Sequence, residues 1–173
     1  MRHVISVLLQ NEVGALTRMT GLFATRGYNI DTLNVAPTQE ATVSRVTLVV
    51  SGSDDAIAQL NAQLAKLVDV VSIHDMTLGE LFERELVIVK LKLTADQVAQ
   101  AHALATQFCA EILDDAVDSF TMQLTGAQDE VDNFVRAAMI TGKLAAVARS
   151  GSVAVSQGEV TLSSYVRHHR LSG

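Results

Sequence analysis

Tryptophan is absent from this sequence of 173 residues, and cysteine and proline occur once each. Because Cys109 has no second cysteine to pair with, an intrachain disulfide is excluded and a reducing compartment is expected. Only 4% of the residues are aromatic, whereas 49% are apolar, which is enough to build a hydrophobic core. The composition therefore indicates a globular protein, in which Cys109 is expected to be a small buried core residue.

Sequence motifs that carry catalytic chemistry are missing as well. The chain has no P-loop, zinc-protease helix, nucleophile elbow or dinucleotide-binding glycine motif. His3, His74 and His102 are dispersed without metal-ligand spacing, and no carboxylate pair stands out for acid–base work. We therefore expect no catalytic residue and no metal site, and we favour a binding or regulatory chain over a catalyst.

The sequence also lacks an excess of positive charge and long apolar runs. Its formal net charge of −6 argues against non-specific binding of nucleic acid, which depends on clustered Lys and Arg. The one basic cluster, Arg-His-His-Arg at 167–170, lies near the end. The early apolar run Val4 to Leu9 is too short for a signal-peptide core, and no run is long enough to span a membrane. We expect a cytoplasmic protein.

What the first half does contain is an alternation of strand and helix patterns. The predicted elements are, in order, strand 3–9, helix 14–26, strand 28–35, strand 45–50, helix 54–67 and strand 68–73. Pro37, the only proline, ends the second strand, and Ser53 is a suitable N-terminal cap for the second helix. The order βαββαβ is the ferredoxin-like arrangement.

The second half repeats this pattern without evident sequence identity. The predicted elements are strand 86–93, a helix opening at 94–97, strand 111–117, strand 120–125, a helix opening at 126–129 and strand 144–148. Thr94 to Gln97 has the form of a capping box, and Gly142 is the expected end of the last helix. The fold class is therefore α+β, with two ferredoxin-like βαββαβ domains in tandem. From Ser156 onward the pattern dissolves into a predicted flexible tail.

The stretch from Leu9 to Asn29 is the best candidate for a binding site. A strand ends at Leu9, a polar loop turns at Gly14, and a helix follows, whose first N–H groups lack internal partners and attract anions. Asn11 and Asn29 place amide side chains at the two ends of this helix. From spacing alone, the same residues also fit a plain turn at Gly14, a cap at Asn11 and a polar strand start at Asn29.

Several short segments along the chain together resemble one known family. They are Asn-Glu-Val-Gly-Ala-Leu at 11–16, Arg-Gly-Tyr-Asn-Ile at 26–30, Val-Ala-Pro-Thr at 35–38, Leu-Val-Asp-Val at 67–70, Glu-Arg-Glu-Leu at 83–86 and Val-Ala-Arg-Ser-Gly at 147–151. This set is similar to the small regulatory subunit of bacterial acetolactate (acetohydroxyacid) synthase, which begins with an ACT domain. The resemblance implies an ACT domain at 1–77, a C-terminal ferredoxin-like regulatory domain at 78–155 and a tail at 156–173.

The resemblance also implies an effector and two protein partners. The family's small subunit binds an end-product amino acid, here valine, and passes feedback inhibition to a separate catalytic subunit, which it also activates. Its ACT domains pair into a homodimer with the effector at the interface, so the loop Asn11 to Ala15 of one chain would meet Asn29 of the other. Cofactors, namely thiamine diphosphate, Mg²⁺ and flavin adenine dinucleotide, would belong to the catalytic subunit, and none is expected in this chain.

Roles for individual residues follow from the resemblance in the same way. The N–H groups near Gly14 and Ala15 would hold the effector carboxylate, and Asn29 would take its ammonium group. Leu16, Ile30 and Val35 would form the pocket for the apolar side chain. This chain has Val13 where many ACT domains carry proline, which removes a preset φ angle but leaves the anion site.

Two other classes of function stay open at this point. An ACT-type amino-acid sensor that controls transcription would use the basic tail for nucleic acid, against the acidic net charge. A small enzyme built on two ferredoxin-like halves would need catalytic residues that the sequence does not offer. Because one methylene is worth only about 1 to 3 kcal/mol, the sequence does not separate valine from isoleucine or leucine.

Overall fold

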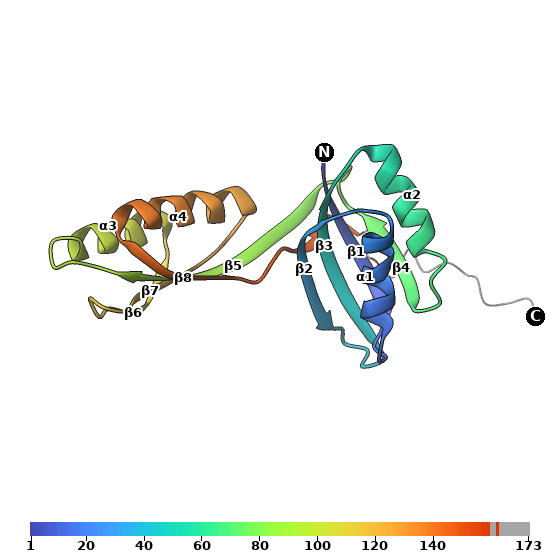
Figure 1. The fold of residues 1–173 in the computed structure, drawn as a ribbon, viewed down its shortest axis with the longest axis horizontal. Coiled ribbons are helices and arrows are strands. Elements are labelled where there is room, and N and C mark those ends of the chain that lie inside the picture. The colour runs from blue at the N-terminus through green and yellow to red at the C-terminus, as the bar shows by residue number, and fades with distance from the viewer. Residues whose placement is uncertain (160–161, 163–173) are drawn as a thin grey trace, which may run out of the picture. The chain divides into compact units, whose positions relative to one another are not determined.

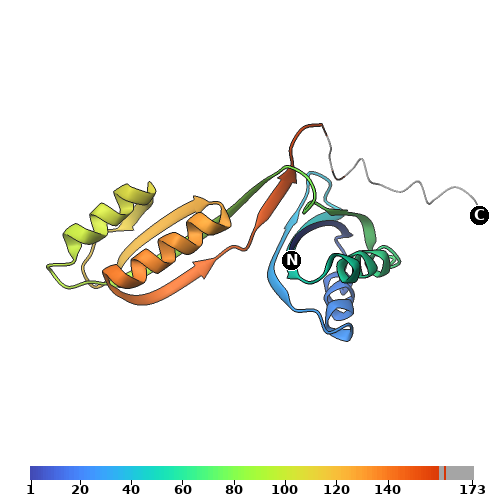
Figure 2. The same ribbon diagram turned by 90° about the horizontal axis from the view of Figure 1, so that it is seen from above.

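The computed structural model describes residues 1–159 and 162, which form two compact units (Figure 1). The first unit contains Met1–Phe82 and the described residues from Ser152 onward, and the second contains Glu83–Gly151. Each unit has an antiparallel sheet with two helices on one face, as Figure 2 also shows. The predicted α+β class with two ferredoxin-like halves is confirmed.

The first unit follows the order βαββαβ. Its elements are β1 (Arg2–Gln10), α1 (Ala15–Thr25), β2 (Ile30–Pro37), β3 (Val43–Ser51), α2 (Asp54–Leu64) and β4 (Val70–Asp75). The strand order in the sheet is β2-β3-β1-β4, so β2 and β4 are the two edges. Alternate residues of β1 and β3 face the helices, and the core they form with α1 and α2 consists of Ile5, Val7, Leu9, Ala15, Met19, Phe23, Val46, Leu48, Val50, Ile57, Leu60 and Leu64. Burying one large side chain of this kind contributes about 1.5 to 3 kcal/mol.

The second unit repeats this topology. Its elements are β5 (Leu81–Lys92, of which Leu81 and Phe82 belong to the first unit), α3 (Val98–Phe108), β6 (Glu111–Asp114), β7 (Phe120–Gly126), α4 (Gln128–Thr141) and β8 (Lys143–Arg149), in the sheet order β6-β7-β5-β8. Its core contains one buried carboxylate, that of Glu85. Arg149 binds both oxygens of Glu85, at 2.9 and 2.7 Å, and also reaches Asp132 at 2.8 Å. This bidentate pairing satisfies a charge that would otherwise be costly to bury.

Local sequence signals place the helix ends well. Ser53 caps α2 as predicted, because its side chain accepts from the Ala56 N–H. Half of the predicted capping box is present: Gln97 Oε1 accepts from the Thr94 N–H at 2.9 Å, although α3 begins only at Val98. Gly142 directly follows α4 as predicted. A Cβ there would lie 2.5 Å from a methyl group of Leu93, so the glycine permits a close approach.

Four other expectations need correction or extension. The strand predicted at 86–93 begins at Leu81, and the one predicted at 111–117 ends at Asp114, where the side chain accepts from the Ser119 hydroxyl and starts a turn. A further strand, β9 (Val153–Ser156), was not predicted and pairs with β5. The expectation that Cys109 is buried is wrong: it is exposed at the C-terminal end of α3, beyond the apolar positions of that helix that pack on the core. The predicted tail lies outside the described residues except for 156–159 and Leu162, and so does the basic cluster at 167–170.

Candidate functional site

The loop between β1 and α1 is tied to two neighbouring segments of the first unit. The Gln10 N–H donates to the Asp69 carbonyl, and the Asn11 N–H donates to the Thr42 carbonyl, both at 2.8 Å. The side-chain amide of Asn11 also donates to the Ala41 carbonyl at 3.1 Å. Asn11 therefore links the loop to the connection between β2 and β3 through both its main chain and its side chain.

Gly14 ends this loop as the N-cap of α1, with φ at +85°. Glycine adopts this left-handed conformation without the steric cost that a Cβ imposes. Its carbonyl accepts the first helical bond from the Arg18 N–H at 2.9 Å, and the Ala15 N–H donates to the Glu12 carbonyl at 3.2 Å. No side chain caps the helix, and its first turn holds no acidic residue, whereas the first turns of α2 and α4 each hold two. The positive end of the α1 dipole is therefore not compensated by its own first turn.

An ion pair that the sequence did not reveal holds this helix end in place. Arg18 binds both carboxylate oxygens of Asp69, at 2.6 and 2.8 Å, and only 3% of the surface of Asp69 is exposed. Hydrogen bonds from Arg18 lower the pKa of Asp69. The guanidinium lies against the loop, since its Nη1 is 2.8 Å from where a Cβ at Gly14 would stand. It adds positive charge beside the helix start, close to the acidic Glu12.

Asn29 and Ile30 lie at the opposite end of the sheet from this loop. Ile30, the first residue of β2, pairs with Val50 near the end of β3, whereas Pro37 pairs with Ser44 at its beginning. The separation along β3 is roughly 20 Å at 3.3 Å per residue. Asn29 is exposed, and its amide donates to Asp31 at 3.3 Å. Within one chain, Asn29 therefore does not meet the loop.

The three apolar residues predicted for the site are divided between these two ends. Ile30 and Val35 pair with Val50 and Val46, which face the helices, so both belong to the helix-covered face of β2. Val35 is 41% exposed and lies toward the end of β2 that is next to the loop, and Leu16 is exposed in the first turn of α1. The structure thus gathers Asn11, Gly14, Ala15, Leu16 and Val35 at one end of the sheet and leaves Asn29 and Ile30 at the other.

Two kinds of feature are missing from the part of the chain that the structure describes. Within residues 1–159 and 162, no three His, Cys, Asp or Glu side chains come close enough together to hold a metal ion. In the same part of the chain, no helix has the length and apolar character needed to cross a membrane.

Both halves of the chain match families of known proteins. Residues 5–72 match the family described as "AHAS small subunit-like ACT domain", and residues 84–158 match "Small subunit of acetolactate synthase". The acetolactate synthase small subunit of Haemophilus influenzae is 42% identical over 92% of this chain and 98% of its own length. The isozyme 3 small subunit of Escherichia coli is 39% identical with the same coverage.

A solved structure agrees with these sequence matches. The crystal structure of the acetolactate synthase small subunit from Thermotoga maritima superposes with a TM-score of 0.83 and 28% identity, covering 92% of this chain and 99% of that one. The resemblance inferred from short segments is thereby confirmed over nearly the whole sequence. With an ACT domain in its first half and the small-subunit domain in its second, the chain belongs to the acetolactate synthase small-subunit family.

Proposed function

We propose that this chain is the regulatory, non-catalytic subunit of an acetolactate synthase in branched-chain amino acid biosynthesis. In this proposal it activates a separate catalytic subunit and inhibits it when L-valine binds between the ACT domains of two copies of the chain. The chemistry, and the thiamine diphosphate, Mg²⁺ and flavin it uses, belong to the catalytic subunit. Similarity to small subunits over nearly their full length supports this assignment.

The observation that carries the proposal is the loop at the start of α1. Gly14 exposes main chain without a Cβ, the first turn of α1 holds no acidic side chain, and Arg18 adds a positive charge. An effector carboxylate at this helix start gains about 0.3 to 1 kcal/mol from the dipole, and up to about 2 kcal/mol when partly buried. Hydrogen bonds and burial of the isopropyl group supply the rest of a micromolar to millimolar affinity, about −8 to −4 kcal/mol.

The geometry of β2 explains why a second copy is needed. β2 is an edge of the sheet, so its outer side can pair with the β2 of another chain. Two copies related by a two-fold axis run antiparallel there. The start of one β2, with Asn29 and Ile30, then lies beside the end of the other, where the partner's loop is found. The residues that are about 20 Å apart in one chain are thereby brought to one site.

In this arrangement Asn11 holds the loop in place, and the other predicted residues contact the ligand. The N–H groups near Gly14 and Ala15 bind the carboxylate of valine, for which the Ala15 N–H exchanges its 3.2 Å bond to the Glu12 carbonyl. Asn29 of the second copy accepts from the ammonium group of valine. Leu16 and Val35 of one chain and Ile30 of the other enclose the isopropyl group. Because the ligand contacts both chains, its binding favours one arrangement of the pair over others, which is what allosteric control requires.

An assay with the catalytic subunit tests this function. Adding the chain should raise the rate of acetolactate formation, and L-valine should then lower it. Gly14→Asp places a carboxylate where that of valine must lie, so inhibition should be lost while activation remains. Gly14→Asn is the matched control, because it adds a side chain of nearly the same shape without the charge and tolerates the same backbone conformation. Full valine inhibition of the Gly14→Asp complex, or no effect of the chain on the rate, would contradict the proposal.

A further inference from the structure

The face of the first sheet opposite α1 and α2, here called the outer face, is covered by the chain's own later residues. Val4 of β1, Val49 of β3 and Met76 form a small apolar cluster on this face with Ala154 of β9. Farther along, the Ser72 hydroxyl donates to the Leu162 carbonyl at 3.0 Å. The outer face is therefore an interior surface at these points rather than a solvated one.

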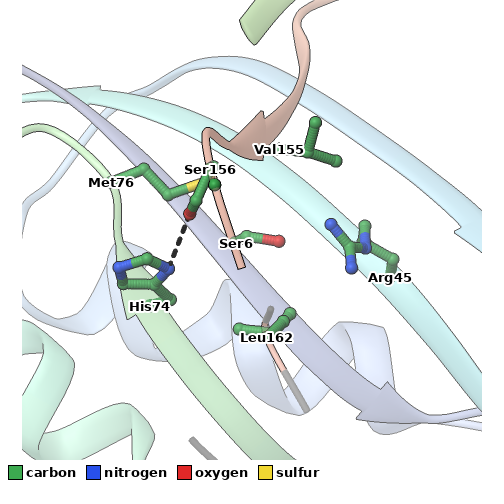
Figure 3. Close-up of a pocket in the computed structure, with 8 residues that line it drawn as sticks. Ser6, Arg45, His74, Met76, Val155, Ser156 and Leu162 are labelled. Atoms are coloured by element: carbon green, nitrogen blue, oxygen red, sulfur yellow. Dashed lines mark hydrogen bonds between the residues drawn. The ribbon is translucent and has the colours of Figure 1, made fainter. Parts of the chain in front are cut away.

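Between the outer face and this covering segment lies a cavity of about 120 Å³ (Figure 3). Its lining includes Ser6, Arg45, His74, Met76, Ser156 and Leu162. One water molecule takes about 30 Å³ of liquid volume, so the cavity has room for a molecule of several non-hydrogen atoms. All of these residues belong to the first unit.

Ser6 gives the cavity an unsatisfied hydrogen-bonding group. It sits in the middle of a row across the sheet, paired with Thr47 on β3 and with His74 on β4. Only 1% of the surface of Ser6 is exposed, and the Ser6 Oγ has no hydrogen-bond partner among residues 1–159 and 162. Buried hydroxyls in native proteins nearly always have a partner, because an unmade hydrogen bond costs the full desolvation of the group. A molecule in the cavity would supply it.

The charges around Ser6 favour a negatively charged molecule. Figure 3 shows Arg45 beside the cavity, and this guanidinium forms no ion pair with an acid in the described part of the chain. His74 lies on the other side, with Nδ1 3.3 Å from the Ser156 hydroxyl. Burial lowers the pKa of His74, so its imidazole is neutral near pH 7 and Arg45 is the positive charge of the site. Arg45 and the hydroxyls of Ser6 and Ser156 can all donate.

We propose that this cavity binds a short aliphatic carboxylate, with Arg45 and the Ser6 hydroxyl donating to the carboxylate oxygens. The planar guanidinium matches a carboxylate in geometry and charge. Met76, Val155 and Leu162 line the remainder and suit a small aliphatic group. Phosphate could use the same donors but would place its polar oxygens against these apolar side chains. The site lies on the outer face, whereas the effector site proposed above involves α1 and the helix-covered face of β2.

Isobutyrate is a suitable probe, with isobutyramide as its uncharged analogue. Calorimetry on the full chain should show saturable, millimolar binding of isobutyrate, at least about tenfold weaker binding of isobutyramide, and no stronger binding of phosphate. Equal binding of isobutyramide, preference for phosphate, or no saturable binding of isobutyrate at about 50 mM would each overturn the proposal.

Variants then locate the binding. Arg45→Gln should weaken isobutyrate binding about tenfold or more, whereas Arg26→Gln, which removes the same charge from the exposed end of α1, should not change it. Ser6→Ala should weaken binding without lowering the melting temperature of the free chain, because the hydroxyl has no partner to lose. Gly14→Asp should bind isobutyrate normally. Unchanged binding by Arg45→Gln, or loss in Gly14→Asp, would place the carboxylate elsewhere and refute this site.

Discussion

Gly14 occupies a backbone conformation that a side chain makes costly. Its φ of +85° is left-handed, and an added Cβ would meet Arg18 Nη1 at 2.8 Å, which Asp69 holds in place. We expect Gly14→Ala to lower the free energy of unfolding by about 1 to 2 kcal/mol. The matched control is Gly21→Ala in α1, where an added Cβ has no atom within 4 Å. This substitution should raise the free energy of unfolding by about 0.5 to 1 kcal/mol, because alanine favours a helix more than glycine does. Urea denaturation measures both, and a Gly14→Ala variant as stable as the native chain would contradict this account.

The Arg18–Asp69 pair makes stability depend on pH in the acid range. Because Arg18 lowers the pKa of Asp69 in the folded state, the unfolded chain takes up this proton at higher pH than the folded one. The contribution is complete above about pH 4 and is lost as the pH falls through the lower pKa of the folded state. Urea denaturation midpoints between about pH 6 and pH 3 should therefore fall less steeply for Asp69→Asn than for the native chain.

A control separates this effect from general acid sensitivity. Asp118→Asn removes an exposed carboxylate that forms no ion pair with any described residue. Its urea denaturation midpoints should fall between about pH 6 and pH 3 as steeply as those of the native chain. If the midpoints of Asp69→Asn fell as steeply with pH as those of the native chain, the Arg18–Asp69 pair would not stabilise the loop.

For single residues, contacts between neighbours in the sequence could be predicted, whereas contacts between residues far apart in the sequence could not. The turn at Gly14 could be predicted because this glycine lies between a strand pattern and a helix pattern. Arg18 looks like any charge on a helix, and its partner Asp69 lies 51 residues away, where no spacing rule connects them. The involvement of Asn11 with Ala41 was hidden for the same reason.

Helix α2 offers the clearest test at the scale of an element. Ser53 accepts from the Ala56 N–H at 3.4 Å and precedes Asp54 and Asp55 in the first turn. Since this bond is long, Ser53→Ala should cost about 0.5 to 1 kcal/mol of unfolding free energy, toward the lower part of the range for N-caps. Gln59→Ala, at an exposed position inside the helix, should cost nothing. Equal thermal stability of the two variants would show that the cap contributes nothing.

The elements that periodicity identified are those with a buried face. Strands and helices of both halves follow from spacings of two and of three to four residues, because one side of each packs on a core. Strand β9 (Val153–Ser156) was not predicted, because it is short and only Ala154 is buried, against the first sheet. The start of β5 at Leu81 was not predicted, because residues 81–84 are alternately half-buried and exposed and show no strong apolar pattern.

At the level of the assembled molecule, the proposed effector site requires two chains to pair through the edge strand β2. Val35 is 41% exposed on this strand, so Val35→Lys should leave each chain folded but weaken the dimer, because a charge at the interface must be desolvated. Val68→Lys is the control, since Val68 is 74% exposed and precedes β4 at the opposite edge. Sedimentation should show a lower dimer fraction only for Val35→Lys, and equal dimerisation of both variants would remove β2 from the interface.

Assembly is also where sequence reasoning depended on the resemblance. The βαββαβ order could be derived from pattern alone, but no pattern within one chain indicates the proposed role of Asn29 in a site about 20 Å away. The register of β2 on β3 gives the physical reason: the two ends of β2 lie at opposite ends of the sheet, so the proposed site requires Asn29 from a second copy.

The proposed effector site is tested by titration calorimetry of the purified chain with L-valine, with D-valine and L-isoleucine as comparisons. We expect saturable binding of L-valine at about one site per chain, weak or absent binding of D-valine, and at least about tenfold weaker binding by Asn29→Ala. If neither the chain alone nor its complex with the catalytic subunit bound L-valine, the loop at Gly14 would be a structural turn, and the proposed effector site would be wrong.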